Sequence, residues 1–153
     1  MIGSKLTKSI NNPNVEIYGT MENPIHAKNF ELFLSEHYKE IDECLTIAID
    51  ADTSFTRLLG TILIANEGIS PGSGCGKTLP HIGDFSIQGL TGSHTKDITL
   101  LGKTYKYVPN VLDETDIISM ADMISDSLAI ALNKIFDNEK ENLEPHKKLS
   151  FEL

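Results

Sequence analysis

The order of hydrophobic and polar positions along the chain predicts an alternation of helices and strands. The first helix is expected over residues 2–10, where three apolar side chains are spaced four apart: Ile2, Leu6 and Ile10. A polar segment ends it, and the β-rich alternation of Val15–Gly19 then predicts a strand. Asn23 followed by Pro24 is typical of a helix start. The helix that follows is expected to bury one apolar stripe, made of Phe30, Phe33, Leu34, Tyr38 and Ile41.

The middle of the chain contains its most apolar segment. Cys44–Asp50 is apolar almost to its last residue, as in a strand that is covered on both faces in the middle of a sheet. Two further strands are expected over Gly60–Ala65 and Asp84–Gly89. A hairpin is expected next, with its tight turn at Gly102-Lys103 between the strands Ile98–Leu101 and Thr104–Val108.

A long amphipathic helix is expected from about Asp113 onward. Its apolar face consists of Ile117, Ala121, Ile124, Leu128, Leu132 and Ile135. Helices that alternate with strands indicate a layered α/β fold, and we expect one such domain over residues 1–137. Residues 138–153 begin in a strongly charged segment and are expected to form a polar tail or a fraying helix end.

Composition and charge narrow the class of protein. A chain of 153 residues fits one domain, and its contents of 40% hydrophobic and 23% charged residues are those of a folded globular protein rather than a disordered one. Thirteen basic and 22 acidic residues give a net charge of −9, which argues against nucleic-acid binding. A basic partner remains compatible with this charge.

The cysteines and the apolar segments indicate a compartment. Cys44 and Cys75 are too few for a disulfide framework or a cysteine-built zinc site, which favours a reducing environment. No apolar run approaches membrane-spanning length, and the first residues lack the apolar core of a signal peptide. We therefore expect a cytoplasmic protein without a membrane partner.

One glycine-rich segment comes close to a nucleotide-binding loop. Residues 70–78 read Ser-Pro-Gly-Ser-Gly-Cys-Gly-Lys-Thr, so the closing Gly-Lys-Thr of such a loop is present while Pro71 stands in place of its first glycine. A helix must follow to complete the phosphate site. Pro80 and Gly83 would interrupt it, since proline inside a helix costs about 3 kcal/mol. Nucleotide binding is therefore the least favoured function, and a glycine-rich surface loop is the simpler interpretation.

Three segments together resemble a known family, the YyaC-type sporulation proteins. Residues 18–27 read Tyr-Gly-Thr-Met-Glu-Asn-Pro-Ile-His-Ala, and residues 47–51 read Ile-Ala-Ile-Asp-Ala. The third segment runs from Ile69 through the glycine-rich loop to Leu-Pro-His-Ile-Gly-Asp at residues 79–84, and the family has proline at the position of Pro71. The resemblance extends to about Gly89. Its relatives include the germination protease of spore-forming bacteria and, more distantly, hydrogenase-maturation peptidases.

The resemblance implies a three-layer α/β/α sandwich around a mixed sheet of about five strands. Members of the family begin with a strand that leads into an aspartate-containing segment, whereas Met1–Leu6 resembles the first helix already under way. That strand would lie inside the sheet, between the strands that match Val15–Gly19 and Cys44–Asp50. We therefore expect the natural chain to begin upstream of Met1.

Asp50 is the catalytic residue that the resemblance implies. In the germination protease the matching aspartate is paired with a second one, from the segment that is not found here. Two neighbouring carboxylates cannot both ionise easily, so one can act as an acid and the other as a base in peptide-bond hydrolysis. The substrate would be a protein or peptide. A strand-end aspartate can instead cap the following turn, and a non-catalytic binding or regulatory protein of the same fold is the alternative function.

Several other residues are candidates for a supporting role. Glu22 and His26 could face the crevice that open α/β sheets have at the ends of their strands, where Asp50 is expected. Asp52 and Glu67 are weaker candidates. The loop offers residues that could approach a peptide or an anion closely, namely Gly72, Gly74, Gly76, Lys77 and Asp84. His81 and His94 match no metal-ligand pattern of the relatives. Neither a metal ion nor another cofactor is expected.

Overall fold

The computed structural model describes residues 1–54, 59–71, 79–93, 97–100, 103–106, 111–142 and 149–152. Within them, five strands form one mixed sheet in the order β1-β7-β2-β4-β3. Four strands run parallel to one another, namely β1 (Val15–Ile17), β7 (Leu149–Glu152), β2 (Leu45–Ser54) and β4 (Phe85–Ser93). The edge strand β3 (Ile62–Ala65) runs antiparallel to β4.

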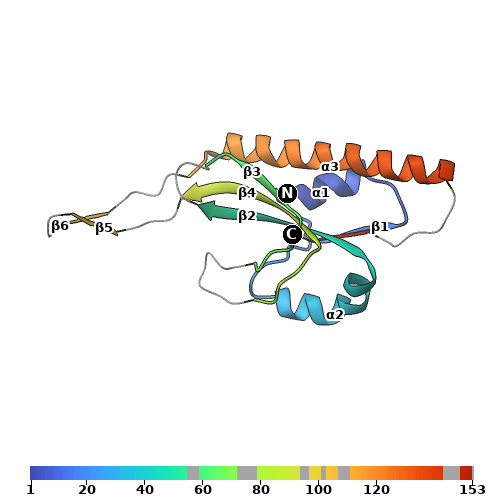
Figure 1. Cartoon of the computed structure of the whole chain (residues 1–153), viewed down its shortest axis with the longest axis horizontal. Helices are drawn as coiled ribbons and strands as arrows, with labels where there is room; N and C mark the ends of the chain where they lie inside the picture. The colour runs from blue at the N-terminus through green and yellow to red at the C-terminus, as the bar shows by residue number, and fades with distance from the viewer. Residues whose placement is uncertain are drawn as a thin grey trace.

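Helices cover both faces of this sheet (Figure 1). On one face lie α1 (Ile2–Ser9) and α3 (Glu114–Asn142), and on the other lies α2 (Phe30–Glu43). The predicted three-layer α/β/α sandwich with a mixed sheet is therefore confirmed.

Two apolar cores hold the layers together, one on each face of the sheet. The core beneath α1 and α3 includes Leu6, Ile49, Ile87, Ile124 and Leu132. The core beneath α2 consists of Phe30, Phe33, Ala48, Leu79 and Ile82. Because successive side chains of a strand point to opposite faces, Ala48 and Ile49 contribute to different cores. This explains why the segment that forms β2 is apolar at consecutive positions.

The start of α2 differs from the sequence prediction. The helix begins at Phe30, not at Asn23-Pro24, and residues 24–29 form a folded loop before it. The carboxamide of Asn29 holds this loop, since its Oδ1 accepts the His26 N–H at 2.8 Å and its Nδ2 donates to the Pro24 carbonyl at 2.9 Å. These bonds give the backbone an alternative to a helix at this point.

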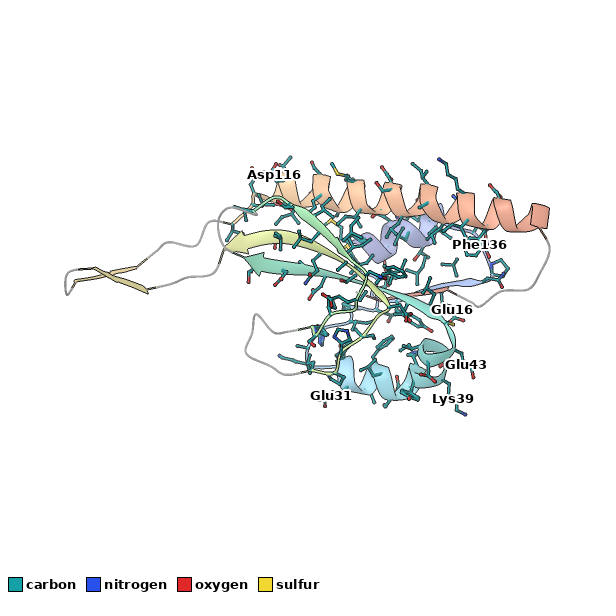
Figure 2. All side chains as sticks on the ribbon, viewed as in Figure 1. Glu16, Glu31, Lys39, Glu43, Asp116 and Phe136 are labelled. Carbon is teal, nitrogen blue, oxygen red and sulfur yellow. The ribbon has the colours of Figure 1, made fainter. Side chains whose placement is uncertain are left out.

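The buried stripes of the two long helices were predicted with one error each. Tyr38 of α2 is 65% exposed, whereas Phe30 and Phe33 are buried as expected. In α3, Ile135 is 47% exposed and Phe136 is buried in its place, pointing from the helix towards the sheet (Figure 2). On α2, the charged Glu31 and Lys39 lie on the side that faces away from the sheet (Figure 2).

The C-terminal residues are not a separate tail in the structure. The helix α3 continues to Asn142, and Leu149–Glu152 forms β7 inside the sheet. The strand β7 pairs with β1 on one side and β2 on the other, which is where the resemblance places a further strand. Leu149–Glu152 is therefore a strand and not part of a polar tail, whereas the helix that reaches Asn142 agrees with the expected helix end.

The predicted hairpin is present as β5 (Asp97–Leu100) and β6 (Lys103–Lys106). Leu100 is paired with Lys103, so Lys103 belongs to β6 and not to the turn where it was expected, while Gly102 lies outside the described residues. The hairpin projects away from the five-stranded sheet (Figure 1).

Candidate functional site

Asp50 lies inside β2 and not at its end. The strand was expected to stop at Asp50, but it continues to Ser54 and stays paired with β4 as far as Ser93. The pairing with β7, in contrast, ends at Ala48 and Glu152. Among the described residues, the part of β2 beyond Ala48 therefore has a strand neighbour on one side alone.

The backbone of β2 shows which of its groups face the open side. The Asp84 N–H donates to the Thr46 carbonyl at 2.8 Å. The backbone N–H and C=O groups of Thr46, and of the alternate residues up to Asp52, therefore point towards β4. The backbone N–H and C=O groups of Ala51 must then point to the open side. Its N–H donates to Oδ1 of Asp50 at 2.8 Å, and the Thr53 N–H donates to Oδ1 of Asp52 at 2.7 Å. Side-chain carboxylates thus bind backbone donors along this edge of β2.

A cavity of about 460 Å³ adjoins this edge. It is formed by the loop that follows β1, by α3 and by β2, and most of its lining is apolar, including Ile2, Met21, Ile25, Ile117 and Met120. Asp50 is the acidic residue in this lining. An apolar cavity with few, well-placed polar groups is the usual form of a ligand site.

The surroundings of Asp50 favour its protonated form. Burial raises the pKa of the Asp50 carboxyl above its ordinary value of 3.8, the Ala51 N–H bond opposes this rise, and the negative charge of Asp52 adds to it. Asp52 is two residues further along β2 and therefore lies on the same face as Asp50. Its Oδ2 accepts a weak bond of 3.4 Å from Nε2 of Gln88 on β4.

The structure thus provides Asp50 with a second carboxylate from its own strand. The sequence prediction ranked Asp52 low and expected the strand to end at Asp50. The Asp-Ala-Asp alternation of residues 50–52 is the sequence signal that could have identified this neighbour, since alternate residues of a strand share one face.

Glu22 and His26 lie together, but not in the cavity of Asp50. They line a second cavity of about 580 Å³, which shares four lining residues with the first, namely Gly19, Thr20, Pro24 and Ile25. A bond to its own backbone N–H and one from the Thr20 hydroxyl lower the pKa of Glu22. Nδ1 of the exposed His26 accepts the Lys28 N–H at 3.3 Å. His26 belongs to the loop before α2, not to the helix where it was expected.

The glycine-rich loop is described only at its base. Gly72, Gly74, Gly76 and Lys77 lie outside the described residues, and so does most of the segment that resembles a nucleotide-binding loop. At the base, Ile69 and Ile82 exchange two backbone hydrogen bonds of 2.8 Å each. Residues 79–83 are not helical, as Pro80 and Gly83 led us to expect.

Gly83 allows the chain to turn from this base into β4. It has a φ of +94°, and a Cβ at this position would lie 2.9 Å from both the Ala48 Cβ and the Phe85 carbonyl oxygen. Only glycine fits such a conformation at this separation without strain.

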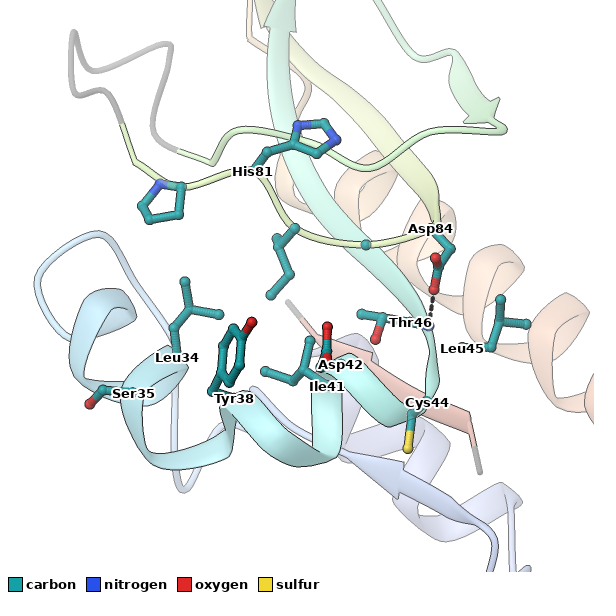
Figure 3. A pocket seen from close by; sticks show the side chains of 13 residues that line it. Leu34, Ser35, Tyr38, Ile41, Asp42, Cys44, Leu45, Thr46, His81 and Asp84 are labelled. Atoms are coloured by element: carbon teal, nitrogen blue, oxygen red, sulfur yellow. Dashed lines mark hydrogen bonds between the residues drawn. The ribbon is translucent and has the colours of Figure 1, made fainter. Parts of the chain in front are cut away.

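Asp84 lies directly before β4 and beside Thr46, which precedes Asp50 by four residues along β2. Its Oδ2 accepts the Thr46 N–H at 2.8 Å, and its own N–H donates to the Thr46 carbonyl (Figure 3). These bonds close the first rung between β2 and β4. Asp84 and His81 line a third cavity, of about 830 Å³, between α2 and the base of the loop (Figure 3). The structure does not bring Asp84 to the cavity of Asp50.

The remaining candidates do not gather into a further site in the described residues. Glu67 is exposed in a bend after β3, and His94 lies outside the described part of the chain. In the segments that are described, no three histidine, cysteine or acidic side chains are arranged to hold a metal ion. None of the helices described is both long and apolar enough to cross a membrane.

Comparison with known proteins places the chain in a family. Residues 1–127 match the family described as "Protein of unknown function (DUF1256)". The chain is also 31% identical over 90 residues to "Uncharacterized protein YyaC" of Bacillus subtilis (strain 168). That alignment covers 59% of this chain and 43% of the relative, so the chain matches less than half of the relative's length. No solved structure matches. The chain therefore belongs to the DUF1256 family and is similar to YyaC.

Proposed function

We propose that this protein is a sporulation-associated peptidase of the YyaC type, which acts on peptide bonds in the cytoplasm of the sporulating cell. The observation that supports this function best is the position of Asp50. Asp50 is partly buried, the pKa of its carboxyl is raised, and the residue lines an apolar cavity, with a second carboxylate next to it on the same strand face.

In the proposed reaction, Asp50 acts as the general acid and Asp52 as the general base. Asp52 takes a proton from a water molecule as the water oxygen attacks the carbonyl carbon of the peptide bond. The C–N bond then breaks, and Asp50 donates its proton to the departing amine nitrogen. Such an assignment follows the rule that two carboxylates with different surroundings divide the roles of acid and base. Neither a metal ion nor a cofactor takes part.

A peptide-cleavage assay tests this function. The purified protein is incubated with a mixture of unstructured peptides, and the products are identified by mass spectrometry. We expect Asp50→Asn to reduce the cleavage rate by about 10²–10⁴-fold, the usual contribution of a positioned acid or base. Asp126→Asn, at an exposed position on α3, is the matched control and should retain the wild-type rate. Cleavage that survives Asp50→Asn would exclude the acid-pair mechanism.

The alternative is a non-catalytic protein of the same fold that binds peptides or regulates a partner. It is favoured by the bonds of Asp50 and Asp52 to the N–H groups of Ala51 and Thr53, since an aspartate with a purely structural role would make such bonds. Peptide binding without cleavage by the wild-type protein would support this alternative. Nucleotide binding remains the least favoured function, and micromolar binding of ATP that is lost in Lys77→Ala would be needed to establish it.

A further inference from the structure

The cavity between α2 and the base of the glycine-rich loop is separate from the cavity of Asp50. It has a volume of about 830 Å³ and shares no lining residue with the cavity of Asp50 or with that of Glu22 and His26. Its walls are α2 from Leu34 onward and residues 80–84, and the start of β2 lies between them (Figure 3). Because the cavity lies on the α2 face of the sheet, these segments form it whichever strand lies beside β2.

Tyr38 is the member of the apolar stripe of α2 that remains uncovered at this cavity. Leu34 and Ile41, on the same stripe, are partly buried and pack against the core beneath α2. Tyr38 lines the cavity and is 65% exposed, and its ring rises from α2 towards residues 80–84 (Figure 3). Tyrosine combines an apolar ring with a polar hydroxyl, and it is common among the residues that contribute most to protein interfaces. A ligand that covers this ring would complete the burial that the spacing of the stripe predicts.

The lining of the cavity is negatively charged. Asp42 lies one helical turn after Tyr38, on the same side of α2, and is exposed (Figure 3). Asp84 is a second acidic residue of the lining. Among the described residues that line the cavity there is no lysine or arginine, and α2 as a whole has five acidic residues and one lysine. These charges favour a basic ligand over an acidic one.

We propose that this cavity binds a protein segment in which an apolar side chain is next to a basic one. The apolar side chain packs between the Tyr38 ring, Leu34 and Ile41, and the basic side chain pairs with the carboxylate of Asp42. The volume of the cavity is within the range of about 300–1,000 Å³ that is usual for ligand sites. The site goes beyond the proposed function, since it holds such a segment whether or not the protein cleaves a peptide bond at Asp50.

Binding of a dye-labelled peptide to matched variants tests this site. The probe is a short peptide with one phenylalanine flanked by lysines, and its binding is followed by fluorescence anisotropy in the Asp50→Asn background, which prevents cleavage through Asp50. We expect Tyr38→Ser to weaken binding about tenfold or more, as for a central interface residue, and Asp42→Asn to weaken it about two- to fivefold. Leu32→Ser and Glu40→Gln are the matched controls and should bind as the background does. Leu32 is 61% exposed, Glu40 is exposed on the same helix, and neither lines this cavity.

Changes to the probe provide a second measurement that leaves the protein unaltered. Replacement of the lysines by glutamates should abolish binding, and replacement of the phenylalanine by serine should weaken it about as much as Tyr38→Ser does. Binding of the glutamate peptide as tight as that of the lysine peptide would overturn the proposal.

The remaining outcomes separate this inference from the proposed function. Binding that is lost in Tyr38→Ser and retained in Leu32→Ser supports the site, even if the wild-type protein cleaves no peptide. Equal losses in these two variants would indicate general attraction to an acidic surface and would overturn the site, as would failure of the probe to bind. A concentration-dependent dimer in sedimentation experiments that Tyr38→Ser dissociates and the probe does not would also overturn it, because a second copy of the chain would then occupy the cavity.

Discussion

Asp50 combines a structural bond with an unfavourable charge. Its Oδ1 accepts the Ala51 N–H, which stabilises the open edge of β2, while burial and the nearby Asp52 raise its pKa. The folded protein therefore binds a proton at Asp50 more tightly than the unfolded chain does. In the pH range between the ordinary value of 3.8 and the raised value, stability must fall as the pH increases. Above that range the carboxylate is ionised in both the folded and the unfolded state, and the loss of folding stability reaches its full value.

This direction of the pH dependence of stability leads to a prediction for Asp50→Asn. The amide keeps an oxygen that can accept the Ala51 N–H, but it carries no charge to desolvate. We expect the variant to raise the melting temperature at pH 7 by about 2 °C, which for a domain of this size corresponds to somewhat less than 1 kcal/mol. Below pH 3.8 the wild-type carboxyl is protonated as well, so the difference should vanish there.

Thermal unfolding followed by circular dichroism at both pH values measures this difference. Asp126→Asn removes an exposed carboxylate from α3 and serves as the control, with no pH-dependent gain expected. An equal change of melting temperature for Asp50→Asn at both pH values would show that the charge of Asp50 is not desolvated in the fold.

At the scale of elements, the hydrophobic pattern correctly predicted structure that depends on residues close together in the sequence. The helix α3 was predicted correctly because Ile124, Leu128 and Leu132 repeat at helical spacing over several turns. The start of α2 was wrong because the signal at Asn23-Pro24 was overridden by side-chain bonds of Asn29.

A strand that forms only by pairing with segments far away in the sequence could not be predicted from its own hydrophobic pattern. The strand β7 alternates apolar and polar residues over only four positions, which is too short a pattern to predict a strand, and its state depends on pairing with β1 and β2. The same holds for the candidate site. Asp50 was proposed from the sequence, whereas Asp52 was ranked low because the continuation of β2 along β4 to Ser54 was not expected.

The base of the glycine-rich loop provides a prediction at this scale. Ile82 is 6% exposed, packs in the core beneath α2 and is bonded to Ile69 through the backbone. Ile82→Ala leaves those backbone bonds possible but opens a cavity in the core. We expect it to lower the free energy of unfolding by about 2–4 kcal/mol, as is usual for truncation of a buried isoleucine.

Urea denaturation measures this loss. Ile64→Ala is the matched control, since the Ile64 side chain on the edge strand β3 is 76% exposed, and we expect a change within about 0.5 kcal/mol for it. Equal losses for the two variants would contradict the role assigned to Ile82 in anchoring the loop base.

At the scale of the whole molecule, the excess of acidic residues opposes the compact state. A net charge of −9 on a single domain produces repulsion that unfolding relieves, because the charges move apart in the unfolded chain. Salt screens this repulsion over a Debye length of about 10 Å at 0.1 M. The ion pair between Lys5 on α1 and Asp122 on α3 is partly exposed and offsets little of it.

We therefore expect the melting temperature to rise when NaCl is increased from 10 to 150 mM at pH 7. Differential scanning calorimetry measures the rise. The same comparison near the isoelectric point, where the net charge is close to zero, is the control and should show a much smaller change. A melting temperature that falls with salt at pH 7 would indicate that attractive pairs outweigh the general repulsion.

The position of β7 also sets the order in which the molecule can be completed. Val15 of β1 is paired with Leu149, which lies 149 − 15 = 134 positions later in the chain. In the sheet order, β7 is the strand between β1 and β2, so the first strand among the described residues joins the sheet through the last. A ribosome that makes the chain from its N-terminus releases β1 long before that partner exists. Pairings between such distant segments form slowly, and the early strand waits exposed in the meantime. The sheet is therefore completed late in the folding of each newly made chain, and β1 is the segment that most needs protection until then.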